Sequence, residues 1–313
     1  GRDADALAAF ERVHALDPAD EPAAMQRAYL LQKVGFNRAA TRSFAALAHS
    51  QDKDRAAQSC AAWANLRGHP DKVFARPWFG EVDAAPEYNG HFDMGVLPVA
   101  ARIGRPIDAA HQIDVYAGVR ATLDTRSGQG HFGPQIYNDN ALVLAAGVRA
   151  QPLAALPLQV FAEAGAARDL TDRDRPRWRN DVRGGFQFFQ QWGDATTCEA
   201  VRSGFRPVAD LYAAGVFYSR YNNNVLFHAR ARAGLRIVER KALALDAYLL
   251  GAAGIDTKGI ADNRFEELGA GLALHFHDPM RLTGRAELVR VHRHKGLQSY
   301  DTARVRMEYQ GAF

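Results

Sequence analysis

Residues 225–237 read VLFHARARAGLRI, and apolar side chains occupy every second position of this stretch. Phe227 and Ile237 fall on one face of an extended chain, whereas Arg230 and Arg232 fall on the other. A spacing of two residues predicts a β-strand with one apolar and one polar face. The stretch is longer than most strands of soluble sheets, and its length suits a tilted crossing of a bilayer.

The same alternation recurs on both sides of this stretch, from residue 76 to residue 313. The predicted strands cover about 78–88, 91–104, 112–124, 141–151, 158–168, 179–192, 207–220, 225–238, 242–256, 264–277, 281–293 and 302–313. A soluble sandwich also alternates. Long strands, apolar faces of Ala, Leu and Val, and aromatic residues near strand ends indicate instead an all-β transmembrane antiparallel barrel of about twelve strands.

The connections between these strands alternate in length. Long polar links such as 125–140 and 257–263 follow the third and ninth strands, whereas 239–241 and 278–280 are short. Residues 193–206 are an exception, because they form a long link on the side where short ones are expected. Short periplasmic turns and long external loops are typical of outer-membrane barrels, and an even strand count predicts that both barrel ends are periplasmic.

Residues 1–75 follow a different period. Gly1, Ala6 and Phe10 recur 34 residues later as Gly35, Ala40 and Phe44, and Leu-Asp-Pro at 16–18 marks a turn. This spacing predicts an α-helical segment of tetratricopeptide-type repeats, in which each helical pair buries its apolar face only against its neighbours. Two such units are too few for stability, so we expect further repeats upstream and a precursor longer than this chain.

Composition excludes some functions. The 313 residues carry a formal net charge of +4 and a mean hydropathy of −0.30, and the basic residues are scattered. Because no Lys/Arg cluster is present, we expect no nucleic-acid partner. No apolar stretch has the length that a membrane helix needs.

The inward positions of the predicted barrel carry arginines, carboxylates and tyrosines. They are Asp114, Arg120, Glu163, Arg183, Asp210, Tyr212, Tyr218, Arg220, Arg230, Arg232, Arg236, Asp246, Tyr248, Arg285, Glu287, Arg304, Arg306 and Glu308. As a transport path they would offer guanidinium forks to carboxylates and aromatic faces to sugar rings. As a structural network, the opposite charges would neutralise one another and fill the lumen. Both interpretations stay open, and a slight excess of arginine favours a neutral or anionic cargo.

Histidines suggest a metal site at first sight. His275 and His277 share one face, and so do His292 and His294. Strand direction puts the two pairs at opposite rims, and no carboxylate is evident beside either pair. We therefore expect no bound metal.

A resemblance to a twelve-stranded outer-membrane phospholipase family would imply a serine and a histidine side by side on the lipid-facing wall, as a nucleophile with its base. Ser219 is an outward serine, but Phe227 and Ala229 take the outward positions of the next strand. No Gly-rich phosphate loop or dinucleotide fingerprint occurs. We therefore expect neither an enzyme nor a cofactor.

Helical repeats that run directly into a barrel resemble the exopolysaccharide exporters of Gram-negative bacteria, namely the cellulose, poly-N-acetylglucosamine and Pel exporters, and a related podophage adsorption receptor. The stretches 134–140 (PQIYNDN) and 218–224 (YSRYNNN) look like loops of such barrels. The closing Tyr309 and Phe313 resemble the aromatic signature that barrel assembly machinery reads. The best-known exporters have larger barrels, so a twelve-stranded one leaves much less room for a pore.

The resemblance implies an outer-membrane component of an exopolysaccharide export system. Its repeats would lie in the periplasm and recruit periplasmic or inner-membrane proteins of a synthase complex, while the lipid-embedded barrel passes a polysaccharide. The alternative is a surface receptor or adhesin whose lumen is plugged by charge pairs and whose external loops carry the function. Pore conductance would separate these two classes.

Overall fold

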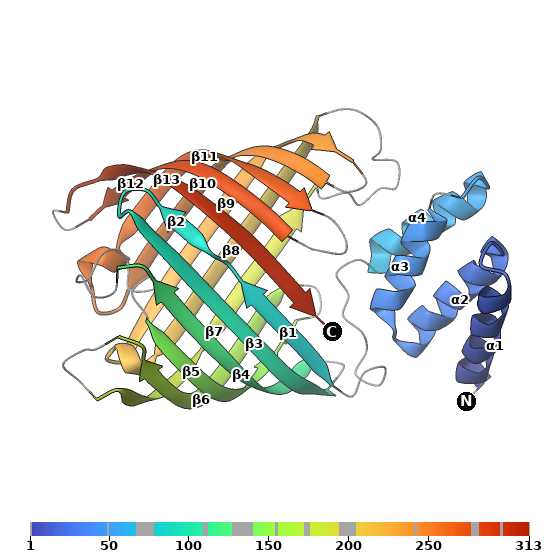
Figure 1. The fold of residues 1–313 in the computed structure, drawn as a ribbon, viewed down its shortest axis with the longest axis horizontal. Helices are drawn as coiled ribbons and strands as arrows, with labels where there is room; N and C mark the ends of the chain where they lie inside the picture. The colour runs from blue at the N-terminus through green and yellow to red at the C-terminus, as the bar shows by residue number, and fades with distance from the viewer. Residues whose placement is uncertain are drawn as a thin grey trace. The chain divides into compact units, whose positions relative to one another are not determined.

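The computed structural model describes residues 2–48, 50–66, 78–108, 112–126, 140–153, 156–171, 176–193, 205–240, 243–276, 282–294 and 297–312. The described helices form one compact unit and the described strands form a second, which begins at Trp78 (Figure 1).

The first unit contains four described helices. They are α1 (Arg2–Leu16), α2 (Glu21–Val34), α3 (Asn37–Leu47) and α4 (Lys53–Leu66). The start of α2 is capped by Asp20, whose side chain accepts a hydrogen bond from the Ala23 N–H at 2.9 Å. It ends at Gly35, which has φ +95° and thus adopts the left-handed conformation that glycine tolerates best. Among the described residues, no helix is long and apolar enough to cross a bilayer.

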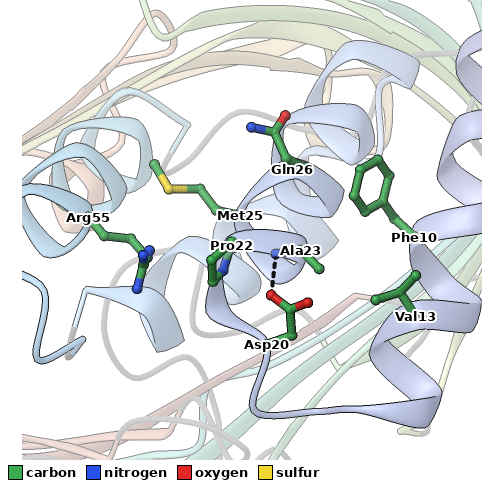
Figure 2. A pocket seen from close by; sticks show the side chains of 8 residues that line it. All are labelled: Phe10, Val13, Asp20, Pro22, Ala23, Met25, Gln26 and Arg55. Carbon is green, nitrogen blue, oxygen red and sulfur yellow. Dashed lines mark hydrogen bonds between the residues drawn. The ribbon is translucent and has the colours of Figure 1, made fainter.

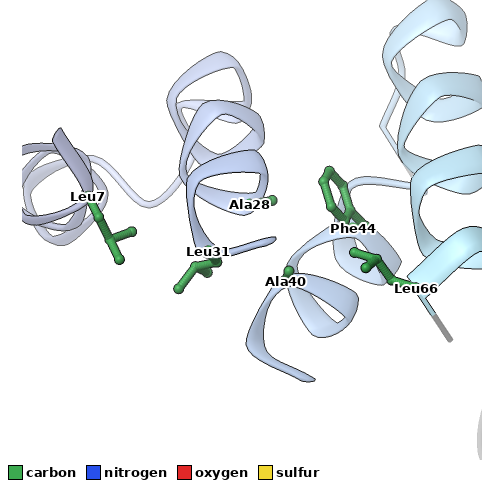
Figure 3. Close-up of a cluster of buried hydrophobic side chains, with 6 residues drawn as sticks. All are labelled: Leu7, Ala28, Leu31, Ala40, Phe44 and Leu66. Atoms are coloured by element: carbon green, nitrogen blue, oxygen red, sulfur yellow. The ribbon is translucent and has the colours of Figure 1, made fainter. Parts of the chain in front are cut away.

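The core of this unit consists of apolar side chains from all four helices. They are Leu7, Ala28, Leu31, Ala40, Phe44 and Leu66, which meet in Figure 3. Ala28 and Ala40 are completely buried, so small side chains let α2 and α3 approach closely. The spacing of 34 residues places Ala6 and Phe10 on α1, and Ala40 and Phe44 on α3. The tetratricopeptide character of the helices stays a prediction.

The second unit is a single antiparallel sheet that closes on itself. Its described strands are β1 (Phe79–Ala84), β2 (Glu87–Asn89), β3 (Met94–Asp108), β4 (Ile113–Asp124), β5 (Ala141–Ala150), β6 (Leu158–Asp169), β7 (Trp178–Trp192), β8 (Arg206–Tyr218), β9 (Asn224–Glu239), β10 (Leu243–Asp256), β11 (Phe265–Phe276), β12 (Leu282–Arg293) and β13 (Tyr300–Ala312). From β3 to β13 each strand pairs with the next along the chain. The barrel shape is evident in Figure 1.

The first and last strands close the barrel. Both β1 and β2 pair with β3 on one side and with β13 on the other, so together they occupy one of twelve strand positions. The prediction of a barrel of about twelve antiparallel strands is confirmed, with one extra segment. A single strand over 78–88 was wrong, because Pro86 has no N–H to donate and interrupts the ladder. Its carbonyl still accepts the Met307 N–H at 2.9 Å, which keeps β13 bound across the break.

Alternate side chains face opposite sides of this wall. The leucines Leu249, Leu268 and Leu288 are 70 to 72% exposed, although all three lie within long strands. Their chain neighbours, such as Leu250, are buried on the inner side. A soluble protein rarely leaves such large apolar side chains exposed on a continuous wall. The outer surface therefore has the character of a surface that faces lipid.

Candidate functional site

The structure places every predicted lumen residue on the inner side of the wall. Seventeen of the eighteen lie on β4, β6 to β10, β12 and β13, and Arg220 lies in the short turn η2 (Ser219–Tyr221). Each of their arginines forms an ion pair with a described carboxylate. Most of them gather into two ion-pair networks, Arg236 and Asp246 form a smaller third group, and each described ion pair of this set joins members of one group.

The first network is centred on Glu163 of β6. Its carboxylate accepts hydrogen bonds from the Tyr116 hydroxyl at 2.7 Å and from Arg183 Nε at 2.6 Å. Arg120 of β4 also donates to it. The other branch of the Arg120 guanidinium donates to Asp181 on β7 at 3.0 Å, across two intervening strands. Glu163 and Asp181 are buried, and a buried carboxylate without a cation would destabilise the fold. The arginines therefore stabilise these two charges.

A second fork extends the first network toward β1. Arg149 of β5 donates through Nε to Asp114 at 2.9 Å. Its two terminal nitrogens donate to the two oxygens of Glu81, each at 2.7 Å. This is the bidentate geometry that makes arginine a strong carboxylate partner. The guanidinium also lies 4.8 Å from the centre of the Phe79 ring, so it is held on an apolar face as well.

Glu287 of β12 occupies the centre of the second network. It accepts hydrogen bonds from Arg232 Nη2 at 3.1 Å and from the Tyr248 hydroxyl at 2.9 Å. Arg304 lies 3.5 Å from the same carboxylate and donates to both oxygens of Glu267, at 3.1 and 2.8 Å. Arg232 lies on β9, so its contact with β12 also passes over two strands.

The second network continues along β8 and β13. Asp210 lies 3.9 Å from Arg230 and 3.7 Å from Arg232. Glu308 receives Arg285 Nε at 3.1 Å and lies 3.2 Å from Arg306 Nε. The carboxylates that face the lumen pair with these guanidinium groups and neutralise them. The arginine excess expected from the sequence therefore does not give the inner wall a positively charged surface.

A third group lies near the rim where β9 ends and β10 begins. There Arg236 donates to both oxygens of Asp246, at 2.7 and 3.2 Å. His275 Nε2 lies 2.9 Å from the same carboxylate. At the opposite rim His294 lies 3.4 Å from Glu266. The expectation that no carboxylate lies beside these histidines was wrong, because register brings in residues far away in sequence. Within the described residues no three potential ligands gather for a metal ion, and His277 lies outside the described part.

Several network members were missed from the sequence. The missed residues Glu81, Asp181 and Glu267 each form an ion pair with an arginine, as the predicted Asp114 and Glu163 do. The sequence signal existed for Asp181, because it shares the phase of Arg183 two residues away. The same signal existed for Glu81, which shares the phase of Asp83, but its partner Arg149 lies 68 positions away and has no local signal.

Aromatic rings line part of the inner wall beside the second network. The rings of Tyr212 and His228 lie 5.9 Å apart, and those of His228 and Phe265 lie 6.2 Å apart. Arg230 lies 5.7 Å from the Tyr212 ring centre. Aromatic faces of this kind bind the apolar faces of sugar rings, so the inner wall offers an alternative to charge recognition.

The helical unit has a pocket of its own, of about 450 Å³, between α1 and α2 with one residue from α4. Its lining residues are Phe10, Val13, Asp20, Pro22, Ala23, Met25, Gln26 and Arg55 (Figure 2). Beside it, hydrogen bonds from the Ser50 hydroxyl and from Arg55 lower the pKa of the Glu21 carboxyl. The pocket thus combines exposed apolar side chains with a charged edge.

Of the outward residues named in the sequence analysis, the structure describes Tyr309 and Ser219 but not Phe313. Tyr309 lies on β13 and is 41% exposed on the outer side, whereas Phe313 lies outside the described residues. Their role as an assembly signal stays a prediction. Ser219 accepts the Val182 N–H through its hydroxyl at 2.8 Å, which gives this side chain a structural bond.

No protein-family model matches the chain, and no curated protein matches it. Among solved structures, the beta domain of the Bordetella autotransporter Brka is similar over 75% of this chain and 99% of its own, with 12% identity and a TM-score of 0.34. An outer membrane channel from Pseudomonas putida F1 matches over 75% and 95%, with 13% identity and a TM-score of 0.33. A bacterial polysaccharide outer membrane secretin matches over 75% and 98%, with 9% identity and a TM-score of 0.37. Sequence identities and TM-scores this low carry no information about the function of this chain.

Proposed function

We propose that the chain is a bacterial outer-membrane barrel that passes a glycan. The observation that carries the proposal is the division of the closed wall into an apolar outer face and a polar, aromatic inner face. Leu249, Leu268 and Leu288 would be stable against hydrocarbon and unfavourable in water. A closed sheet satisfies its backbone hydrogen bonds internally, which is the condition for crossing a bilayer.

The pairing of the arginines narrows the cargo to a neutral glycan. The charge of a guanidinium that already donates to two carboxylate oxygens, as those of Arg149 and Arg304 do, is neutralised, so it attracts an anionic sugar weakly. Tyr212 remains as a face for a sugar ring. The path would run between the two networks, because each described pair stays within its own network.

The helical unit would lie in the periplasm and recruit partner proteins, as tetratricopeptide repeats in the exporter family do. The pocket beside Phe10 and Val13 supports this part of the proposal, because exposed apolar groups with a charged edge are suited to a peptide. A glycan synthase complex in the periplasm or inner membrane is the proposed partner.

Conductance tests the transport proposal. The full chain is inserted into planar bilayers, and single-channel current is recorded with and without maltohexaose, a neutral glycan. We expect discrete openings that maltohexaose blocks reversibly, and Tyr212→Ala should weaken the block about tenfold through loss of one stacking face. Inserted, folded barrels that never conduct would contradict transport.

A plugged surface receptor is the second candidate, and the cross-barrel pairs favour it. Arg120 with Asp181 and Arg232 with Glu287 each bridge two intervening strands and lie where an open lumen would need space. A receptor of this kind inserts without conducting, and its external loops bind the ligand. The bilayer recording therefore separates the two functions.

A further inference from the structure

The outer face of the barrel carries a groove that the transport function does not use. It has a volume of about 570 Å³, which is within the range of small-molecule sites. Register across β7 to β10 puts Phe186, Gly215, Phe227 and Ile255 in one row. A Cβ on Gly215 would lie within 2.8 Å of both phenylalanine rings, so the two rings pack over this glycine and form one continuous apolar ridge.

The next row consists of small side chains. Ala213, Ala229 and Ala253 are register partners across β8 to β10, and all three line the groove. They make a shallow floor beside a ridge of large apolar groups. An extended hydrocarbon chain fits such a floor, because contact with the ridge removes apolar surface on both partners.

The end of the groove is polar. The alanine row continues to Glu266, which pairs with His294 at 3.4 Å, and Arg264 lies beside them in the lining. The Nε–H of Arg264 is buried and has no hydrogen-bond partner. A buried, unsatisfied donor costs free energy unless a ligand meets it, and a guanidinium prefers an anionic oxygen.

The position of the groove fits the edge of an apolar belt. On β11 the outward residues change from Leu268, which is 72% exposed, to the charged Glu266. On β12 the outward Arg290 is the register partner of Leu268, forms an ion pair with Asp301 of β13 and follows the outward Leu288. An amphiphile lying here would have its chain along the belt and its head group beside Arg264.

We propose that this groove binds a phosphorylated lipid of the surrounding membrane, with an acyl chain along the alanine floor beside Phe186 and Phe227 and the phosphate at Arg264. The inference rests on the proposed membrane setting and is independent of any cargo in the lumen. The lipid would stabilise the rim where β7 to β11 meet the head-group region.

Native mass spectrometry of the full chain in detergent micelles tests the proposal. The probes are dipalmitoyl phosphatidate, which has chains and a phosphate, and dipalmitoylglycerol, which lacks the phosphate. We expect one phosphatidate to bind at least tenfold more tightly than the diacylglycerol. Equal binding of the two probes, or a ladder of many weakly bound phosphatidates, would overturn the site.

Three variants locate the binding. Arg264→Gln should weaken phosphatidate binding about tenfold, and Ala229→Phe should do the same by filling the floor. Arg290→Gln is the matched control, because it removes an outward guanidinium at the same rim that already has its carboxylate. Equal losses in Arg264→Gln and Arg290→Gln would show general charge attraction and overturn the proposal.

Folding is checked for each variant by its heat-dependent mobility in gel electrophoresis. If Ala229→Phe fails to fold, Arg264→Gln alone decides, since it changes only a polar tip. The membrane proposal fails separately: a chain that does not insert into phosphatidylcholine vesicles contradicts the barrel's setting. A chain that inserts but binds phosphatidate no better than diacylglycerol contradicts only the groove.

Discussion

At the scale of single residues, Arg232 shows how the lumen is held together. Its guanidinium lies 3.1 Å from Glu287 and 3.7 Å from Asp210, and its side chain is only 4% exposed. Desolvating three charges is costly, and only their mutual attraction offsets that cost. Removal of this one cation therefore affects two carboxylates at once.

We predict that Arg232→Gln lowers the free energy of unfolding by about 3 kcal/mol, because it leaves buried carboxylates without their cation. Arg290→Gln removes a guanidinium whose pair with Asp301 is about two thirds exposed, and it should cost under about 1 kcal/mol. Urea unfolding of the folded barrel in micelles, followed by tryptophan fluorescence, measures both. Equal effects of the two variants would contradict the buried network. Reduced glycan secretion at unchanged stability would identify Arg232 as part of a transport path instead.

The sequence could place such residues on the inner side, because alternation alone fixes the face of each strand position. It could not supply partners. Arg120 and Asp181 meet across β5 and β6, and only the curvature of the closed sheet brings them together. The sequence alone therefore does not distinguish a transport path from a structural network of ion pairs.

At the scale of elements, the long strands could be predicted with bounds that differ from the structure by a few residues. β9 was expected at 225–238 and covers Asn224–Glu239, because its alternation is uninterrupted. The first strand was the failure. Pro86 was visible in the sequence, but the shared pairing of β1 and β2 with β13 depends on closure of the barrel.

The helix α2 allows a test of local sequence signals. Asp20→Ala should lower the stability of the helical unit by about 1 kcal/mol, because the Ala23 N–H loses its capping oxygen. Asp17→Ala is the control, since Asp17 bonds the Ala19 N–H in the preceding turn and not at a helix N-terminus. Circular dichroism at the helix minimum, recorded on the full chain during heating, measures the change. An unchanged helical transition in Asp20→Ala would contradict the capping role.

At the scale of the whole molecule, the even number of strand positions fixes where the barrel's ends lie. Glu81 near the start of β1 pairs with Ala312 at the end of β13, so the barrel starts and finishes at the same rim. The segment after β10, which includes Lys258, lies at the opposite rim, because β10 runs in the same direction as β4 and away from the rim where β9 ends. If the barrel spans a membrane, the barrel ends and the segment that includes Lys258 therefore lie on opposite sides of it.

We predict that an epitope inserted after Lys258 is stained by antibody on intact cells. An epitope inserted after Leu16, which is 87% exposed between α1 and α2, should be stained only after the outer membrane is permeabilised. Both insertions lie at exposed turn positions, so a difference between them reports sidedness and not local accessibility. The outer membrane excludes antibody, and the chain between the two sites contains the first nine strand positions, an odd number of crossings. Staining of the Leu16 epitope on intact cells, with the Lys258 epitope hidden, would reverse the orientation and remove the helical unit from the periplasm. Staining of both on intact cells would contradict a membrane crossing altogether, because an odd number of crossings must separate the two sites.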